Sequence, residues 1–131
     1  MAGGKATYRL GDLQLRIMRV LWQLAPAGVA QVQERLGDGL AYTTVATMLR
    51  KMEDRGLVRH EEVGRKFLYR PLVSAQDVRR SMADDLIDRL FAGSLSDAVS
   101  HLLETREVSH AELARLGQLI ERRKRQDKRG A

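Results

Sequence analysis

The sequence has no cysteine, only 2 prolines, and aromatic residues at just 5% of its 131 positions. Without cysteine it can have no disulfide scaffold, no thiolate metal site and no cysteine nucleophile, and this composition fits a reducing cytosol. No apolar run approaches the roughly 18 residues of a membrane span, and no apolar signal core follows the start. We therefore expect a mainly helical protein of the cytoplasm.

Charge is distributed unevenly along the chain. Residues 1–73 hold 12 basic and 7 acidic side chains, a net charge of +5, whereas residues 74–120 hold 5 and 8, a net charge of −3. Residues 121–131 hold 6 and 2, a net charge of +4, which completes the +6 of the whole chain. An excess of Lys and Arg suits a polyanionic partner, so the first part is the one that we expect to face it.

Three helices are predicted in close succession, one that opens at Gly11 and two over 29–36 and 41–55. Gln14, three residues after Gly11, completes a capping-box arrangement. Gly56 is suited to stop the third helix, because a left-handed conformation costs little without a Cβ. This spacing is typical of a helix-turn-helix module whose third helix reads DNA.

The helix predicted over 41–55 has two faces. Val45, Met48, Leu49 and Met52 repeat at helical spacing and should hold it on the core. The other face is small and hydroxyl-bearing at its start and basic further along, which suits a DNA groove because short side chains let the backbone approach base edges. Taken alone, this stretch would also fit an ordinary surface helix.

The period of the hydrophobic pattern changes after this helix. Strands are predicted over 57–62 and 67–70, joined by a tight turn over 63–66. A hairpin directly after a helix-turn-helix is a wing, and its tip carries Arg65 and Lys66. Two basic residues on a turn are by themselves an ordinary solvated surface, but behind a reading helix they favour contact with phosphate or the minor groove.

Three more helices are predicted after residue 74, each opened by a serine with an acidic residue three positions later. Each is apolar on one face, and they have little to bury against except each other and a second copy of the chain. We therefore predict domains over 1–73 (DNA binding), 74–124 (dimerisation) and 125–131 (a frayed basic tail). The residues assigned to the dimer interface are Leu86, Leu90, Phe91, Leu95, Val99, Leu102, Leu103, Leu113, Leu116 and Ile120.

A search for catalytic or metal-binding patterns finds none. His60, His101 and His110 lie far apart in the sequence, without the close His and carboxylate spacing of a metal site. The glycines do not form a nucleotide-binding loop. The sequence therefore predicts no enzyme activity, no metal and no cofactor.

The order of these elements resembles the BlaI/MecI penicillinase-repressor family of winged-helix transcriptional regulators. The matching segments are LGDLQ at 10–14, IMRVLW at 17–22, AYTTV at 41–45, MLRKM at 48–52, RGLV at 55–58 and YRP at 69–71. The resemblance covers residues 8–73 well and the remainder in helix layout and length. It implies a mainly α fold with a small β-hairpin, namely a winged helix-turn-helix DNA-binding domain followed by a helical dimerisation extension. It also implies a homodimer that binds an inverted-repeat DNA operator and represses transcription.

The resemblance also implies roles for individual residues. The positions that would read bases are Thr43, Thr44, Ala46 and Thr47. Those that would hold the DNA backbone are Tyr42, Arg50, Lys51, Arg65 and Lys66. Some relatives have long basic residues at the positions of Thr43 and Ala46, so the preferred DNA sequence should differ from the penicillinase operator.

The best-studied relatives are inactivated when a membrane sensor triggers cleavage at an Asn-Phe bond in the helical region. The corresponding pair here is His101-Leu102, a departure that weakens the prediction of cleavage. The cysteine-rich tail of copper-responsive relatives is absent. The alternative function is a protein-interaction module that uses the winged helix as a scaffold.

Overall fold

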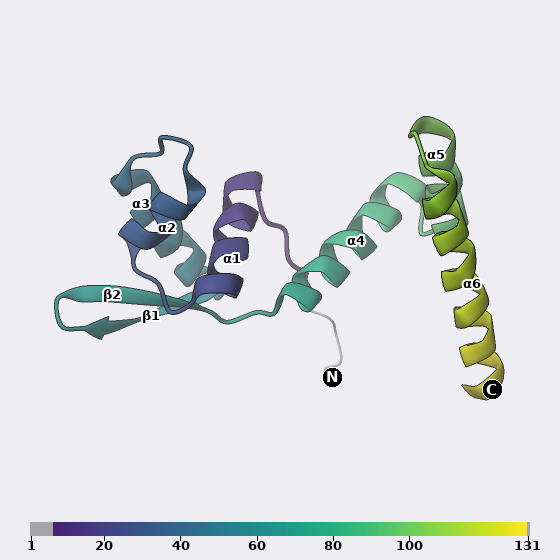
Figure 1. The fold of residues 1–131 in the computed structure, drawn as a ribbon. Helices are drawn as coiled ribbons and strands as arrows, with labels where there is room; N and C mark the ends of the chain where they lie inside the picture. Colours follow the sequence, from purple (N-terminus) through teal and green to yellow (C-terminus); the bar gives the residue numbers. More distant parts are fainter. Residues whose placement is uncertain (1–6, 131) are drawn as a thin grey trace. The chain divides into compact units, whose positions relative to one another are not determined.

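The computed structural model describes residues 7–130 of the chain and the side chains of residues 7–128 (Figure 1). The chain forms two compact units, one that reaches to Leu86 and one that begins at Ile87. The elements, in order, are α1 (Asp12–Leu24), α2 (Val29–Leu36), α3 (Tyr42–Asp54), β1 (Val58–Val63), β2 (Lys66–Pro71), α4 (Ala75–Phe91), α5 (Leu95–Thr105) and α6 (His110–Gly130). The predicted class, mainly α with one hairpin, is confirmed. Among the described residues, no helix is long and apolar enough to cross a membrane.

The core of the N-terminal unit is built from α1, α2, α3, the hairpin and the start of α4. The side chains with less than 2% of their surface exposed are Ile17, Met18, Leu21, Val32, Val45, Leu49, Met52, Val58 and Val78. The helix ends follow the sequence closely: the Gln14 amide oxygen accepts from the Gly11 N–H at 3.1 Å, which is the one bond of the predicted capping box that a glycine can make. Burial of one stripe on each helix fixes how the three helices pack.

The turn after α3 leads directly into the wing. Gly56 has a φ of +80°, and the Leu57 N–H donates to the Met52 carbonyl oxygen at 3.0 Å. A left-handed glycine with this bond is a Schellman-type helix end, which confirms the predicted role of Gly56. Only residues 55–57 therefore separate α3 from β1.

β1 and β2 form an antiparallel hairpin that projects from the helices of its unit in Figure 1. Val63 pairs with Lys66, and Gly64 supplies a φ of +64° in the turn between them. A two-stranded hairpin is marginal alone. Here the Ala27 N–H donates to the Tyr69 carbonyl oxygen at 3.1 Å, and the Tyr69 N–H returns a bond of 2.8 Å. This third segment anchors the base of the wing to the turn before α2.

The first turns of α4 belong to the N-terminal unit. Ser74 Oγ accepts from the Asp77 N–H at 3.0 Å, which confirms the predicted cap. Val78 is 1% exposed, and Met82 packs against the same core. The Tyr8 N–H donates to Ser81 Oγ at 2.7 Å. The compact unit thus extends beyond residue 73, where the sequence placed the end of the DNA-binding domain, because Val78 buries itself with α1.

The C-terminal unit has little core of its own. Ser94 Oγ accepts from the Asp97 N–H, and Ser109 Oγ accepts from the Glu112 N–H, both at 3.1 Å. Among residues 87–128, only Ala98 has a buried side chain.

α6 continues to Gly130, so residues 125–130 are helical where the sequence predicted a frayed tail. Ion pairs one turn apart support this end of the helix, with Arg123 Nε 3.1 Å from Asp127 Oδ1 and Lys124 Nζ 3.5 Å from Glu121 Oε1. Ala131 lies outside the described residues.

Candidate nucleic-acid interface

The two faces predicted for α3 are present. Val45, Leu49 and Met52 are fully buried, so they hold the helix on the core. The side chains of Thr43, Thr44 and Thr47 are exposed. Ala46 differs from these threonines, because it is half-buried and packs against the core.

A groove of about 500 Å³ runs between α3, the wing and the start of α2. Its lining includes apolar, aromatic and charged side chains from all three elements. The lining residues are Gly28, Val29, Ala30, Gln31, Tyr42, Ala46, Arg50, Glu53, His60, Arg65, Lys66, Phe67 and Tyr69.

The groove brings together five of the predicted DNA-contacting residues. Tyr42, Ala46 and Arg50 reach it because a spacing of four residues repeats on one face of a helix. Arg65 and Lys66 reach it from the wing. The remaining predicted residues, which do not line this groove, are Thr43, Thr44, Thr47 and Lys51.

The cations of the groove are available for an external anion. No side chain among residues 7–128 forms an ion pair with Arg50, Arg65 or Lys66. The other two wing arginines are engaged, since Arg70 lies 3.3 Å and Arg59 3.7 Å from the same Glu61 carboxylate oxygen. Unpaired cations on a groove are suited to phosphate.

The contact between Glu53 of α3 and His60 of the wing was not predicted from the sequence. His60 Nδ1 lies 2.7 Å from Glu53 Oε1, and the His60 backbone N–H donates to Glu53 Oε2 at 3.2 Å. The His60 ring also stacks on Phe67, with centroids 4.4 Å apart and ring planes at 29°. This contact ties the last turn of α3 to both wing strands. The alternation of Phe67 and Tyr69 along β2 could have signalled the shared face, but the residue separation between Glu53 and His60 could not.

Tyr69 lies where the wing meets the helices. Its side chain is 5% exposed, and burial raises the pKa of its hydroxyl above the ordinary value, with a further contribution from the Glu53 carboxylate. The hydroxyl is therefore neutral near pH 7. The backbone of Tyr69 carries the bridge to Ala27, so this residue fixes the base of the wing.

Within the described range, no group of three or more His, Asp or Glu side chains could hold a metal ion.

Three helices with exposed threonines and a free arginine on the third, followed by a cationic hairpin, define a winged helix-turn-helix of the DNA-binding kind. The sequence model of the penicillinase repressor family matches residues 10–122. The chain belongs to this family of DNA-binding transcriptional repressors, which confirms the resemblance.

Two relatives agree with this assignment in sequence, and one solved structure is also similar. The chain is 26% identical to the penicillinase repressor of Bacillus licheniformis over 122 residues, 92% of this chain and 95% of that protein. It is 36% identical to the transcriptional regulator BlaI of Mycobacterium tuberculosis over 100 residues, 73% of this chain and 72% of that protein. A solution structure of the DNA-binding domain of the repressor BlaI aligns with a TM-score of 0.49 and 26% identity, over 56% of this chain and 93% of that chain.

Proposed function

We propose that the protein represses transcription as a homodimer that binds an inverted-repeat operator through α3 and the wing. The observation that carries this proposal is the groove beside α3, which gathers the unpaired cations Arg50, Arg65 and Lys66. A dimer with two such surfaces would bind two half-sites about one helical turn of DNA apart, or a multiple of it, so the operator should be a pseudo-palindrome.

Base reading is assigned to the exposed start of α3. The Thr43, Thr44 and Thr47 side chains are short and solvent-facing, so the backbone of α3 can approach base edges in the major groove. Their hydroxyl groups can bond bases, and their methyl groups can contact thymine methyls. Ala46 is half-buried, so its contribution is apolar contact and close approach.

Phosphate binding is assigned to the two sides of the groove. Tyr42 and Arg50 approach it from α3, and Arg65 and Lys66 approach it from the wing, on the backbone or in the minor groove. Lys51 is exposed outside the groove and would hold phosphate from the other side of α3. These contacts would fix the register of α3 on the duplex without specifying sequence.

The homodimer is assigned to the helices after the wing. Most apolar residues predicted for the interface are exposed in the single chain, including Leu90 at 70%, Leu95 at 65% and Ile120 at 54%. A face of this kind is suited to bury itself against a second copy. We propose residues 1–73 as the DNA-binding region and residues 74–124 as the dimerisation region.

Release by proteolysis finds no special support in the local structure. His101 and Leu102 lie in the middle of α5, whereas proteolytic nicking favours exposed loop tips. A protease would have to unwind α5 to reach this bond. A membrane sensor protease or another inducing partner stays a prediction for this chain.

The proposal is tested by selecting operator fragments from genomic DNA and measuring gel shifts over a range of salt concentrations. We expect a pseudo-palindromic site and a steep salt dependence. The triple variant Arg50→Ala, Arg65→Ala, Lys66→Ala removes six cations per dimer. If all six hold phosphate, the slope of log K against log salt should flatten by about 5.

A matched triple variant separates local contact from overall charge. Arg80→Ala, Arg115→Ala and Arg122→Ala remove the same charge from exposed positions outside α3 and the wing. This control should keep nearly all of the operator affinity. Equal losses in the two triple variants would mean that DNA responds only to net charge. An unchanged affinity in the first variant would favour a scaffold role for the winged helix.

A further inference from the structure

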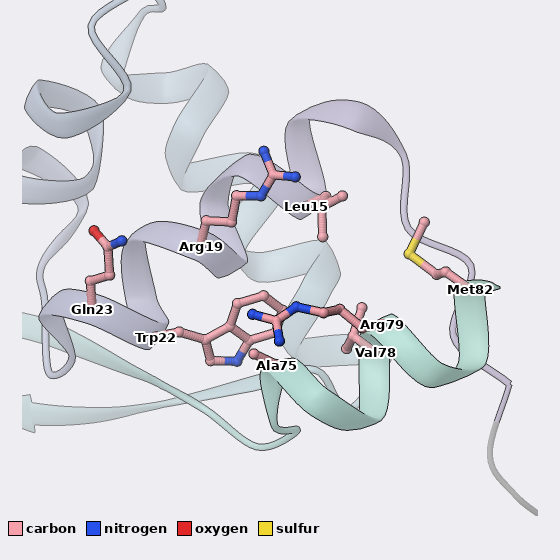
Figure 2. Close-up of a pocket in the computed structure, with 8 residues that line it drawn as sticks. All are labelled: Leu15, Arg19, Trp22, Gln23, Ala75, Val78, Arg79 and Met82. Carbon is pink, nitrogen blue, oxygen red and sulfur yellow. The ribbon is translucent and has the colours of Figure 1, made fainter. Parts of the chain in front are cut away.

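A second pocket lies within the N-terminal unit, between α1 and the first turns of α4 (Figure 2). Its volume is about 510 Å³, which is within the range of small-molecule sites. Half of its lining comes from each helix. The lining residues are Leu15, Arg19, Trp22, Gln23, Ala75, Val78, Arg79 and Met82. None of them lines the groove beside α3.

The body of this pocket is apolar and firmly held. Trp22 is half-buried, and its indole Nε1–H donates to the Val73 carbonyl oxygen at 2.9 Å, which fixes the edge of the ring. Val78 is 1% exposed, and Leu15 and Met82 pack against the same core. The indole of Trp22 is therefore a fixed surface on which an apolar or aromatic group can pack.

The polar groups of the pocket are arginines without partners. Arg19 comes from α1 and Arg79 from α4, and both side chains are exposed. Within residues 7–128, neither arginine has an ion-pair partner, and no Asp or Glu lines the pocket. The only other polar lining residue is Gln23. The charge of the site is therefore positive and uncompensated.

We propose that this pocket binds a small organic acid, with an apolar or aromatic body against Trp22 and a carboxylate or sulfonate held by Arg19 and Arg79. Guanidinium groups are suited to such anions, because their planar N–H donors match the geometry of a carboxylate. A neutral molecule of the same shape would fill the apolar part and leave both arginines unused. The site does not depend on the proposed operator binding, and DNA has no part in its test.

The sole tryptophan of the chain reports directly on this pocket. Trp22 fluorescence of the full-length protein is titrated with 4-phenylbutanoate and with its neutral amide, 4-phenylbutanamide. Both carry the same phenyl group and differ in charge. We expect a saturable change in emission, with the acid binding about tenfold more tightly than the amide.

Substitutions distinguish the contribution of the two arginine charges to binding from that of the pocket volume. Arg19→Gln and Arg79→Gln should each weaken binding of the acid by about three- to tenfold and leave the amide unchanged. Arg80→Gln is the matched control: it lies one residue along α4, is exposed and does not line the pocket. Ala75→Phe should block both probes by filling the space, and its circular dichroism spectrum reports whether the protein keeps its helix content.

Three results would overturn the proposal. The first is equal affinity of the wild-type protein for acid and amide, and the second is an acid affinity that survives the loss of both arginines. The third is a lack of saturation by about 10 mM acid, weaker than a specific site of this kind should be. One further observation would count as the third result, namely a Trp22 emission that shifts when the protein is diluted but does not respond to the acid. A second chain would then cover the pocket.

Discussion

The two compact units of this chain bury their apolar residues in different ways. The N-terminal unit closes its own core, with fully buried side chains from α1, α2, α3, β1 and α4. Between residues 87 and 128, only Ala98 is buried, while Leu90, Leu95 and Ile120 are more than half exposed. Both segments have apolar stripes at helical spacing, so the stripe alone does not tell whether a helix packs within its own chain or against another copy.

This difference separates two kinds of stability. Because the core of the N-terminal unit is closed within one chain, the stability of this unit does not depend on protein concentration. Helices that need a second copy gain their stability only at concentrations where the dimer forms. Substitutions that act on one unit alone test this difference.

The largest effect is expected from a charge in the proposed dimer face. Leu102→Asp or Leu116→Asp would place an unpaired carboxylate from each chain in an apolar seam, and the dimer dissociation constant should rise by at least about 100-fold. Analytical ultracentrifugation measures this constant. Gln118→Asp adds the same charge at another exposed position of α6 and should leave the dimer intact. A dimer that survives the leucine variants would place the interface elsewhere.

A core truncation should destabilise the N-terminal unit at any protein concentration. Leu49 is fully buried, so Leu49→Ala should lower the free energy of unfolding by about 2–5 kcal/mol. Denaturant unfolding followed by Trp22 fluorescence measures this loss. Leu103→Ala, at a side chain that is 43% exposed, provides the comparison. Its cost should be smaller and should appear only where the dimer forms.

The residues themselves explain what the sequence could predict. Helix caps are local signals, because a cap depends on residues three positions apart. The caps here are Gly11 with Gln14, and Ser74, Ser94 and Ser109 with their acidic partners. Helix starts and the wing turn could therefore be predicted closely. The Glu53–His60 contact depends on how α3 meets the wing, which no local pattern records.

The extent of each compact unit was harder to predict. α4 has one apolar stripe, and nothing in its spacing distinguishes Val78, which enters the N-terminal core, from Leu90, which stays exposed. The basic tail over 125–131 was predicted to be frayed, whereas α6 continues to Gly130. The ion pairs of Arg123 and Lys124 with acidic residues one turn away support the helix there. The arginine-flanked pocket was not foreseen, since it needs α1 and α4 side by side.

A smaller effect is expected at the start of α5. Ser94 Oγ accepts from the Asp97 N–H, so Ser94→Ala should cost about 1 kcal/mol of stability in the C-terminal unit. Thermal unfolding followed by circular dichroism, at a concentration that keeps the dimer, measures this cost. Ser100→Ala, at an exposed position in the middle of the same helix, is the control. It removes only a solvent-exposed bond from Ser100 Oγ to Glu104 Oε1 at 3.3 Å and should change stability little.

The smallest effect is expected at alkaline pH. Burial raises the pKa of Tyr69 in the folded state, so the folded state holds this proton more tightly than the unfolded chain. The resulting stability is fully present below the unfolded pKa of about 10 and is lost as pH rises through the folded pKa. Urea unfolding from neutral to alkaline pH should show this loss. In Tyr69→Phe the corresponding decline should be absent, and an identical decline would assign it to other groups.

The most direct test of the two-unit account is amide hydrogen exchange of the full-length protein, measured above and below the dimer dissociation constant. We expect the amides of α1, α2, α3 and the wing to keep the same protection at both concentrations. Those of α5 and α6 should lose protection on dilution, because their apolar face would lose its partner. Protection of α5 and α6 that persists in the monomer would contradict the account.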